Sequence, residues 1–140
     1  MNDFFSSTDL ALLILRVGTG VIFIPHGYPK MTGSGGEEKG GQAHLTQSLA
    51  QMGLPFPHAF AALVGAIEFF GGLLLILGLQ SQWAALALAF VMLVATGRVQ
   101  VQRGFVGNAD FPFSLLVATL AVALLGGGTV SVDQIFLVLK

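Results

Sequence analysis

Four long stretches of the 140-residue chain are almost entirely apolar, and polar residues gather between them. The clearest stretch covers residues 58–79. Counting Asp, Glu, Lys and Arg, it contains one charged residue, Glu68. A helix needs about 20 apolar residues to cross the hydrocarbon core of a bilayer, so each stretch is close to the length of one crossing. The pattern predicts four membrane-spanning helices, over residues 9–27, 58–79, 83–101 and 111–127.

Polar residues mark the connections between these spans. The run Gln80-Ser81-Gln82 is short and typical of a tight hairpin between neighbouring spans. The first connection is the longest, and within it residues 44–52 place leucines at helical spacing, which predicts a short helix lying in the membrane interface. A glycine-rich hydrophilic segment, residues 33–41, precedes that helix. The tail, residues 131–140, is expected to lie in the opposite interface.

Composition supports a location in the membrane. Lys and Arg number 6 and Asp and Glu 7, so 9% of the chain is charged while 54% is hydrophobic. An ordinary soluble domain carries roughly 25% charged residues, and the mean hydropathy here is +0.83. We therefore predict an all-α membrane protein, a single domain over residues 1–140 built as a four-transmembrane-helix bundle in contact with the lipid bilayer. The Lys and Arg residues between the spans favour termini outside the cytoplasm.

Charge and residue usage exclude several classes of function. A net charge of −1 leaves no basic surface for nucleic acid, and the absence of cysteine excludes disulfides, thiolate metal sites and iron–sulfur clusters. His26 and His58 are expected as neighbours at one interface, which does not suit a buried axial pair for haem. With no carboxylate at ligand spacing beside them, we predict no metal and no intrinsic cofactor. No nucleophile–base arrangement stands out, which favours a non-catalytic or partner-dependent role.

Two charged residues lie inside predicted spans, where an ion costs roughly 2.5–3.5 kcal/mol at the bilayer centre. Arg16 comes ten residues before His26 and Glu68 ten residues after His58. At about 1.5 Å per residue, both charges would lie roughly 15 Å below the same membrane face. We therefore expect an Arg16–Glu68 ion pair between the first two spans. Two roles are open for it: a structural pin that fixes helix register, or the polar floor of a pocket that binds a headgroup or passes a proton.

More polar residues are expected at the end of the bundle that carries the long first connection. One interpretation is ordinary snorkelling of polar side chains to the interface. The other is a shallow site for an anionic or quinoid ligand, where a histidine exchanges protons near neutral pH. Together with Arg16 and Glu68, the residues of this predicted ligand-binding set are His26, Lys30, His58, Arg98, Arg103 and Asp110.

Several short motifs follow one another in a recognisable order. They are Arg16, the run His26-Gly27-Tyr28-Pro29-Lys30, then Gly53-Leu54-Pro55, Glu68 with Gly71-Gly72, Gly78-Leu79, and Gly104-Phe105 before Asp110. This ordered set resembles the DoxX family of small bacterial four-helix membrane proteins. The run Gln80-Ser81-Gln82 departs from the pattern, because many members carry a basic residue there.

The resemblance implies a multi-pass protein of the bacterial inner membrane that serves as a membrane subunit of a redox or oxidative-stress system. Lacking cysteine and a credible haem pair, such a subunit would bind a quinone or a small anion, or depend on the cofactor of a soluble redox partner. Two alternatives stay open: a structural anchor or assembly factor without chemistry of its own, and a small transporter that works as a homo-oligomer.

Overall fold

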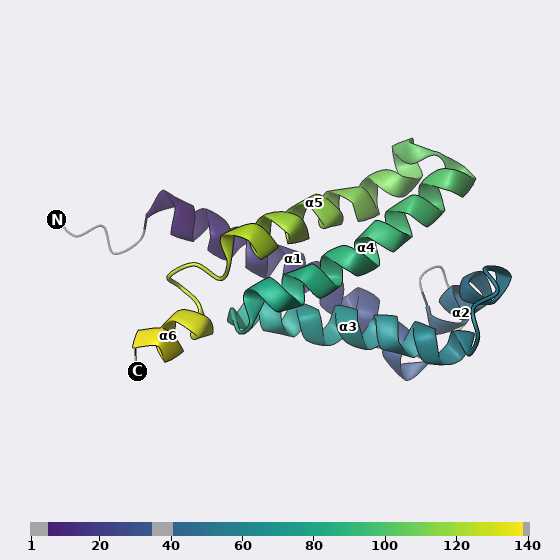
Figure 1. Cartoon of the computed structure of the whole chain (residues 1–140), viewed down its shortest axis with the longest axis horizontal. Coiled ribbons are helices and arrows are strands. Elements are labelled where there is room, and N and C mark those ends of the chain that lie inside the picture. The colour runs from purple at the N-terminus through teal and green to yellow at the C-terminus, as the bar shows by residue number, and fades with distance from the viewer. Residues whose placement is uncertain (1–5, 35–40, 139–140) are drawn as a thin grey trace.

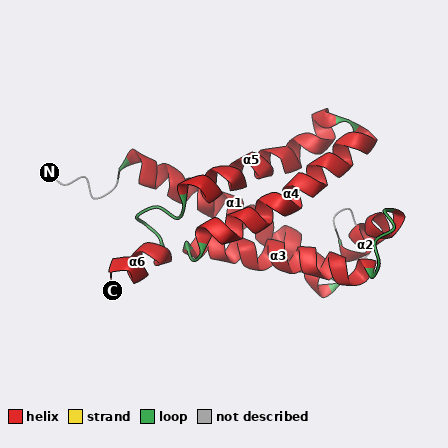
Figure 2. Cartoon of the chain, in the orientation of Figure 1, coloured by secondary structure: helices red, strands yellow, loops and turns green. Residues whose placement is uncertain are grey.

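The computed structural model describes residues 6–34 and 41–138, and the helices in these ranges form an antiparallel bundle (Figure 1). The described residues contain no strand (Figure 2). A short kinked segment, Phe105–Ala109, in which Val106 and Gly107 are not helical, precedes the last of the long helices. The helices are α1 (Ser7–Thr32), α2 (Gln42–Gln51), α3 (Pro57–Leu77), α4 (Ser81–Arg103), α5 (Asp110–Leu125) and α6 (Val132–Val138).

Four segments are long and apolar enough to cross a membrane. The first two are the whole of α1 and α3, and the third is most of α4. The fourth is α5 together with the segment before it. Their bounds are Ser7–Thr32, Pro57–Leu77, Ser81–Arg98 and Phe105–Leu125. Their outward faces expose large apolar side chains, as lipid contact requires, among them Ile14, Phe90 and Leu124. The predicted all-α bundle with four membrane spans is therefore confirmed.

The shorter elements lie at opposite ends of the bundle. Helix α2 confirms the helix predicted over residues 44–52 and packs against α3, at the end that also carries the turn between α4 and α5 (Figure 1). Helix α6 forms in the predicted tail, at the end where both termini lie. We call these the loop end and the terminal end. Most of the glycine-rich segment 33–41 lies outside the described residues.

The first span is longer than predicted. The sequence placed its end at residue 27, but α1 continues to Thr32 and contains both Pro25 and Pro29. Proline removes a backbone hydrogen bond, yet transmembrane helices tolerate it where neighbouring helices support the chain. The helix ends at Gly33, which adopts a left-handed conformation and donates its N–H to the Pro29 carbonyl oxygen at 3.1 Å.

Glycines allow α1 and α3 to pack with their backbones in contact. Gly27 lies against Gly65 and Phe69, and a Cβ atom on Gly27 would stand 2.6 Å from the Gly65 carbonyl oxygen. About two turns nearer the terminal end, Gly20 lies against Gly72. Small residues at such positions let membrane helices approach closely, where dispersion contacts and sealed polar groups stabilise the pair. These contacts fix the register of α1 against α3.

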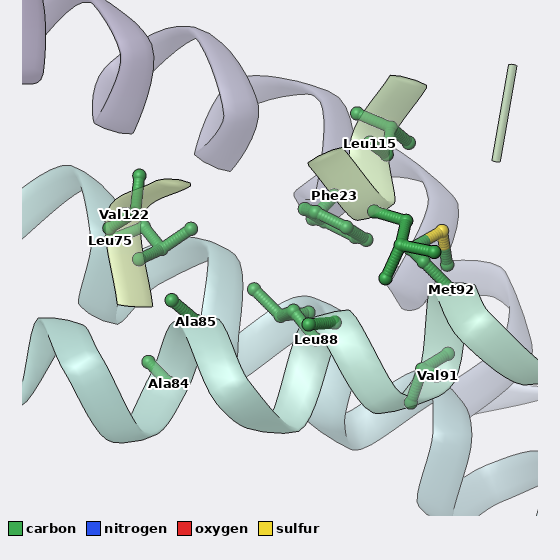
Figure 3. Close-up of a cluster of buried hydrophobic side chains, with 11 residues drawn as sticks. Phe23, Leu75, Ala84, Ala85, Leu88, Val91, Met92, Leu115 and Val122 are labelled. Atoms are coloured by element: carbon green, nitrogen blue, oxygen red, sulfur yellow. The ribbon is translucent and has the colours of Figure 1, made fainter. Parts of the chain in front are cut away.

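The apolar core lies where α4 crosses the other helices (Figure 3). Leu88 of α4 is fully buried and packs with Phe23 of α1 and Leu75 of α3 in one cluster, which α5 completes with Val122. Alanines on the inner face of α4 leave room for these larger side chains. The core therefore joins the tightly packed α1–α3 pair to the α4–α5 hairpin.

We expect Gly27→Ala to destabilise the protein, because the added methyl group would force α1 and α3 apart. Overpacking of this kind costs roughly 1–3 kcal/mol, measured as a lower unfolding temperature in detergent. Gly18→Ala is the matched control, since nothing lies within 4 Å of a Cβ atom at this position on the same helix. An equal loss of stability in both variants would contradict the close α1–α3 contact.

Candidate functional site

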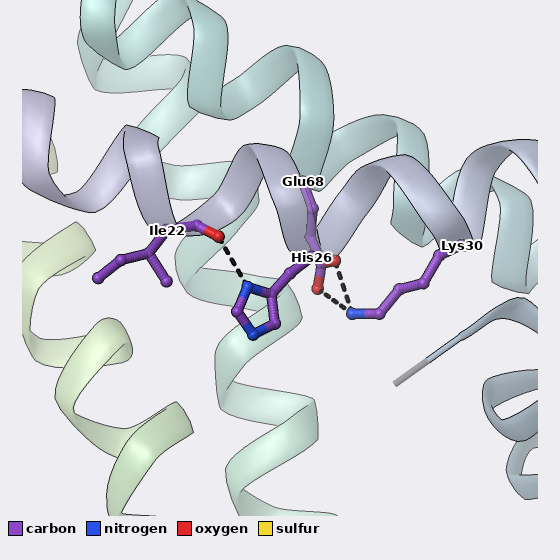
Figure 4. Close-up of polar contacts among 4 residues, drawn as sticks. All are labelled: Ile22, His26, Lys30 and Glu68. Carbon is purple, nitrogen blue, oxygen red and sulfur yellow. Dashed lines mark hydrogen bonds and ion pairs between the residues drawn. The ribbon is translucent and has the colours of Figure 1, made fainter. Parts of the chain in front are cut away.

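A lysine–glutamate ion pair lies between α1 and α3 (Figure 4). Lys30 Nζ donates to both carboxylate oxygens of Glu68, at 2.8 Å to Oε1 and 2.6 Å to Oε2. The Glu68 side chain is 1% exposed and the Lys30 side chain 14%. The carboxylate is thus sealed inside the bundle, and the ammonium group reaches it from the loop end.

The local sequence explains why the pair forms at this level. Glu68 lies beside Gly27, where a Cβ atom would stand 2.9 Å from the Glu68 Cβ atom. Lys30 follows Gly27 by three residues and therefore lies on the same face of α1. Removing two ions from water costs several kcal/mol for each, and a contact through both carboxylate oxygens offsets part of that cost.

The predicted Arg16–Glu68 pair is wrong. Glu68 lies at the level of Gly27, which is 11 residues, or about three helical turns, from Arg16 along α1. The prediction assumed that the first span ends near His26 and the second starts opposite it, at His58. Because α1 continues to Thr32, α3 lies further along it, and Lys30 takes the place assigned to Arg16.

Arg16 lies at the terminal end of the bundle. Its side chain is 1% exposed, and Nη2 donates to the carbonyl oxygen of Val130 at 2.6 Å. It lies against Gly78 at the end of α3, and the Asp133 carboxylate attracts its charge. The two buried ions expected to meet are therefore about three helical turns apart along α1, each with its own partners.

Sequence reasoning missed Asp133, which organises the terminal end. Its carboxylate caps the start of α4 by accepting the backbone N–H groups of Gln80 at 2.7 Å and Ser81 at 3.1 Å. Its own N–H donates to the Gly78 carbonyl oxygen at 3.0 Å. The available signal was the single acidic residue of the tail, residues 131–140, but its partners lie more than 50 residues away in the chain.

His26 lies on α1 beside the Lys30–Glu68 pair (Figure 4). Its Nδ1 is 2.8 Å from the Ile22 carbonyl oxygen. A carbonyl oxygen only accepts, so Nδ1 carries the proton and Nε2 is the acceptor of the neutral ring. The imidazole is exposed, and its centroid lies 5.7 Å from that of Phe111 at a tilt of 32°. A titratable ring is thus available at the bundle surface next to a buried ion pair.

The other predicted site residues lie around the loop end without joining this pair. His58 is exposed at the start of α3, and Arg98 is half-buried near the end of α4. Arg103 is exposed, with its carbonyl oxygen accepting from Asn108 at 3.1 Å. Asp110 accepts from the Gly107 and Phe111 backbone N–H groups, at 3.0 and 2.9 Å, and so shapes the turn between α4 and α5.

A cleft of about 940 Å³ opens at the terminal end. It lies between the start of α1, the α3–α4 turn, the segment after α5, and α6. Its lining is mixed: carboxylates from Asp9 and Asp133, a hydroxyl from Ser81, and apolar surface from Trp83 and Phe136. Across residues 6–34 and 41–138, no group of three or more His, Asp and Glu side chains could hold a metal ion.

Four apolar spans around buried ionic side chains define a small polytopic membrane protein of the four-helix type. Comparison with known families is specific: the DoxX family model matches residues 11–103. The chain belongs to the DoxX family, as the order of its motifs indicated. No solved structure matches the chain.

Two relatives extend the similarity over nearly the whole chain. "Putative oxidoreductase CatD" of Bacillus subtilis (strain 168) is 32% identical over 127 residues, covering 91% of this chain and 87% of the relative. "Inner membrane protein YphA" of Escherichia coli (strain K12) is 28% identical over 140 residues, covering 94% of each. Together with the four spans, these matches support the predicted multi-pass location in the inner membrane.

A double-mutant cycle in detergent measures the pairing directly. Lys30→Met and Glu68→Met should each lower the free energy of unfolding by roughly 3–5 kcal/mol, because each leaves one buried ion without its partner. The double variant should lose clearly less than the sum of the two. Arg16→Met combined with Glu68→Met should be additive within about 0.5 kcal/mol. Stronger coupling of Glu68 to Arg16 than to Lys30 would contradict the observed pair.

Proposed function

We propose that this DoxX-family protein is a membrane subunit of a redox system that binds a quinone at the loop end, beside the Lys30–Glu68 pair, and works with a soluble redox partner. The observation that carries the proposal is the exposed imidazole of His26 next to a sealed ion pair (Figure 4). The oxidoreductase name of the Bacillus subtilis relative supports a redox setting.

The residues at this site suit a quinone. A quinone is a neutral ring dissolved in the bilayer, so it can approach from lipid without crossing a charged surface. The rings of His26 and Phe111 are both exposed, with centroids 5.7 Å apart, which offers an aromatic surface for stacking. A bound quinone would supply two-electron chemistry to a chain that has no cysteine.

The ion pair would support proton exchange at His26. The Nε2 atom of the neutral ring can accept a proton from a quinol hydroxyl, and the charged ring can return it. His26 lies about one helical turn before Lys30 on α1, so the ring that exchanges the proton is on the helix that also supplies the lysine of the ion pair. Lys30 holds the Glu68 carboxylate in place through both of its oxygens. These residues hold and move a proton, while the ligand carries the electrons.

A small anion is less well supported as the ligand. The positive charge of Lys30 is neutralised by Glu68, and the exposed Arg103 lies at the end of another helix. The alternatives from the sequence lead to different outcomes. In a structural anchor the Lys30–Glu68 pair only fixes register. A transporter would need a route through the bundle, and α1 runs as one helix through both of its prolines.

The test is gentle isolation from native membranes, followed by identification of co-purifying proteins and quantification of extractable quinone. We expect the wild type to retain quinone together with a redox enzyme. His26→Leu should retain roughly tenfold less quinone, because it loses a hydrogen bond that can become charge-assisted. His44→Leu on α2 removes a histidine away from the pair and should retain the wild-type amount.

Other outcomes would favour the alternatives. A partner protein without quinone, unaffected by Glu68→Gln, would support the anchor. Recovery of neither partner nor quinone above the level of bulk lipid would reject the redox proposal and favour the transporter. Equal quinone content in the two histidine variants would show that retention does not depend on His26.

A further inference from the structure

The cleft at the terminal end is independent of the site at the loop end and carries an inference of its own. Arg16 and Ser81 are 1% and 0% exposed, respectively, and Ser81 lines the cleft. Within the described part of the chain, no hydrogen-bond partner reaches Arg16 Nε, Arg16 Nη1 or Ser81 Oγ. Buried polar groups are rarely left without a partner, so these donors call for an acceptor that the chain does not supply.

The acceptors nearest to these donors are already engaged. The Val130 carbonyl oxygen accepts from Arg16 Nη2, and both oxygens of Asp133 accept backbone N–H groups at the start of α4. Ser131 Oγ donates to Gly128 and accepts from the Gln134 backbone. The excess of donors predicts a ligand that brings oxygen acceptors of its own.

The glycines around Arg16 place its charge directly behind the cleft wall. A Cβ atom on Gly78 would meet the guanidinium group and would stand 2.7 Å from the Ser131 Cβ atom. A Cβ atom on Gly127 would stand 2.9 Å from both Ser81 Oγ and the Ser131 Cβ atom. Since Ser81, Ser131 and Gly127 all line the cleft, the Arg16 guanidinium lies close behind residues of the cleft wall.

The cleft carries charges of both signs and apolar walls. Arg16 is positive behind the wall, and Asp9 and Asp133 are negative in the lining. Trp83, Phe136 and Leu137 line it too and are 71%, 62% and 68% exposed. Exposed tryptophan and apolar side chains beside polar groups are typical of the interface between headgroups and acyl chains. A ligand that fits all of this has an acceptor-rich anionic group, a cationic group and hydrocarbon chains.

We propose that this cleft is a binding site for a zwitterionic phospholipid with a primary ammonium headgroup. The phosphodiester oxygens accept from Ser81 Oγ and lie toward the Arg16 guanidinium. The ammonium group lies toward the carboxylate of Asp9, and the acyl chains run along Trp83 and Phe136 into the bilayer.

The charge balance favours this lipid over an anionic one. The two carboxylates outnumber the single guanidinium, so a lipid with a net negative charge would add to an excess of negative charge. A zwitterionic headgroup adds no net charge and offers the Asp9 carboxylate an ammonium donor. Free phosphate would satisfy the donors but would leave the apolar walls uncovered.

Trp83 is the only tryptophan in the chain and lines the cleft, so its fluorescence reports the occupant. The full-length protein is placed in nanodiscs of phosphatidylcholine with a tenth of the lipid replaced by acyl-brominated phosphatidylethanolamine or phosphatidylglycerol. We expect the brominated phosphatidylethanolamine to quench Trp83 at least about threefold more than its mole fraction predicts. Arg16→Gln should remove this preference, and Ser81→Ala should weaken it without removing it, because it loses one neutral hydrogen bond.

Thr96→Val is the matched control. Like Ser81, Thr96 is on α4 and has a buried hydroxyl for which the described residues supply no hydrogen-bond partner, but it lies toward the loop end. The Thr96→Val variant should show the same quenching as the wild type. If Arg16→Gln does not fold, Ser81→Ala still tests the proposal. Quenching that follows bulk mole fraction for both lipids would overturn the proposal. So would a preference for phosphatidylglycerol, or loss of the preference on adding inorganic phosphate. None of these results depends on quinone binding at the loop end.

Discussion

The contact between the backbones of α1 and α3 is the constraint on which the rest of the structure depends. Gly27 against Gly65 and Gly20 against Gly72 bring the two helices together at one fixed register. That register decides which residue faces the Glu68 carboxylate. Because a buried carboxylate in the membrane needs a cation beside it, a shift of α3 along α1 would expose an unpaired ion to lipid. Packing and electrostatics therefore select the same arrangement.

The bundle keeps its buried charges at its two ends. At the loop end, Lys30 reaches inward from the last turns of α1 to neutralise Glu68. At the terminal end, Arg16 holds the segment after α5 through the Val130 carbonyl oxygen, and Asp133 ties α6 to the start of α4. The two ends have different chemistry: the first joins a sealed pair to an exposed imidazole, and the second places unmatched donors behind an open cleft.

The length and apolar character of the spans could be predicted from sequence, because a helix that crosses a bilayer must contain about 20 mostly apolar residues. The helix in the first connection and the hairpin at Gln80 were predicted for similar local reasons. The partner of Glu68 could not be predicted. It depended on where α1 ends, which the sequence placed at residue 27 and the structure places at Thr32. Glu68 lies beside Gly27, about three turns further along α1 than Arg16, because α1 runs five residues past its predicted end and α3 extends beyond that end as well.

The sequence by itself determined that this chain is a four-span membrane protein of the DoxX type, since hydropathy and the order of short motifs are properties of the chain alone. It also identified Arg16 and Glu68 as the ions that the bundle must accommodate. Only the tertiary structure decided their partners, Lys30 for Glu68 and the C-terminal segment for Arg16. These pairings join residues distant in the chain, and they follow from helix register and backbone contact, which no local pattern encodes.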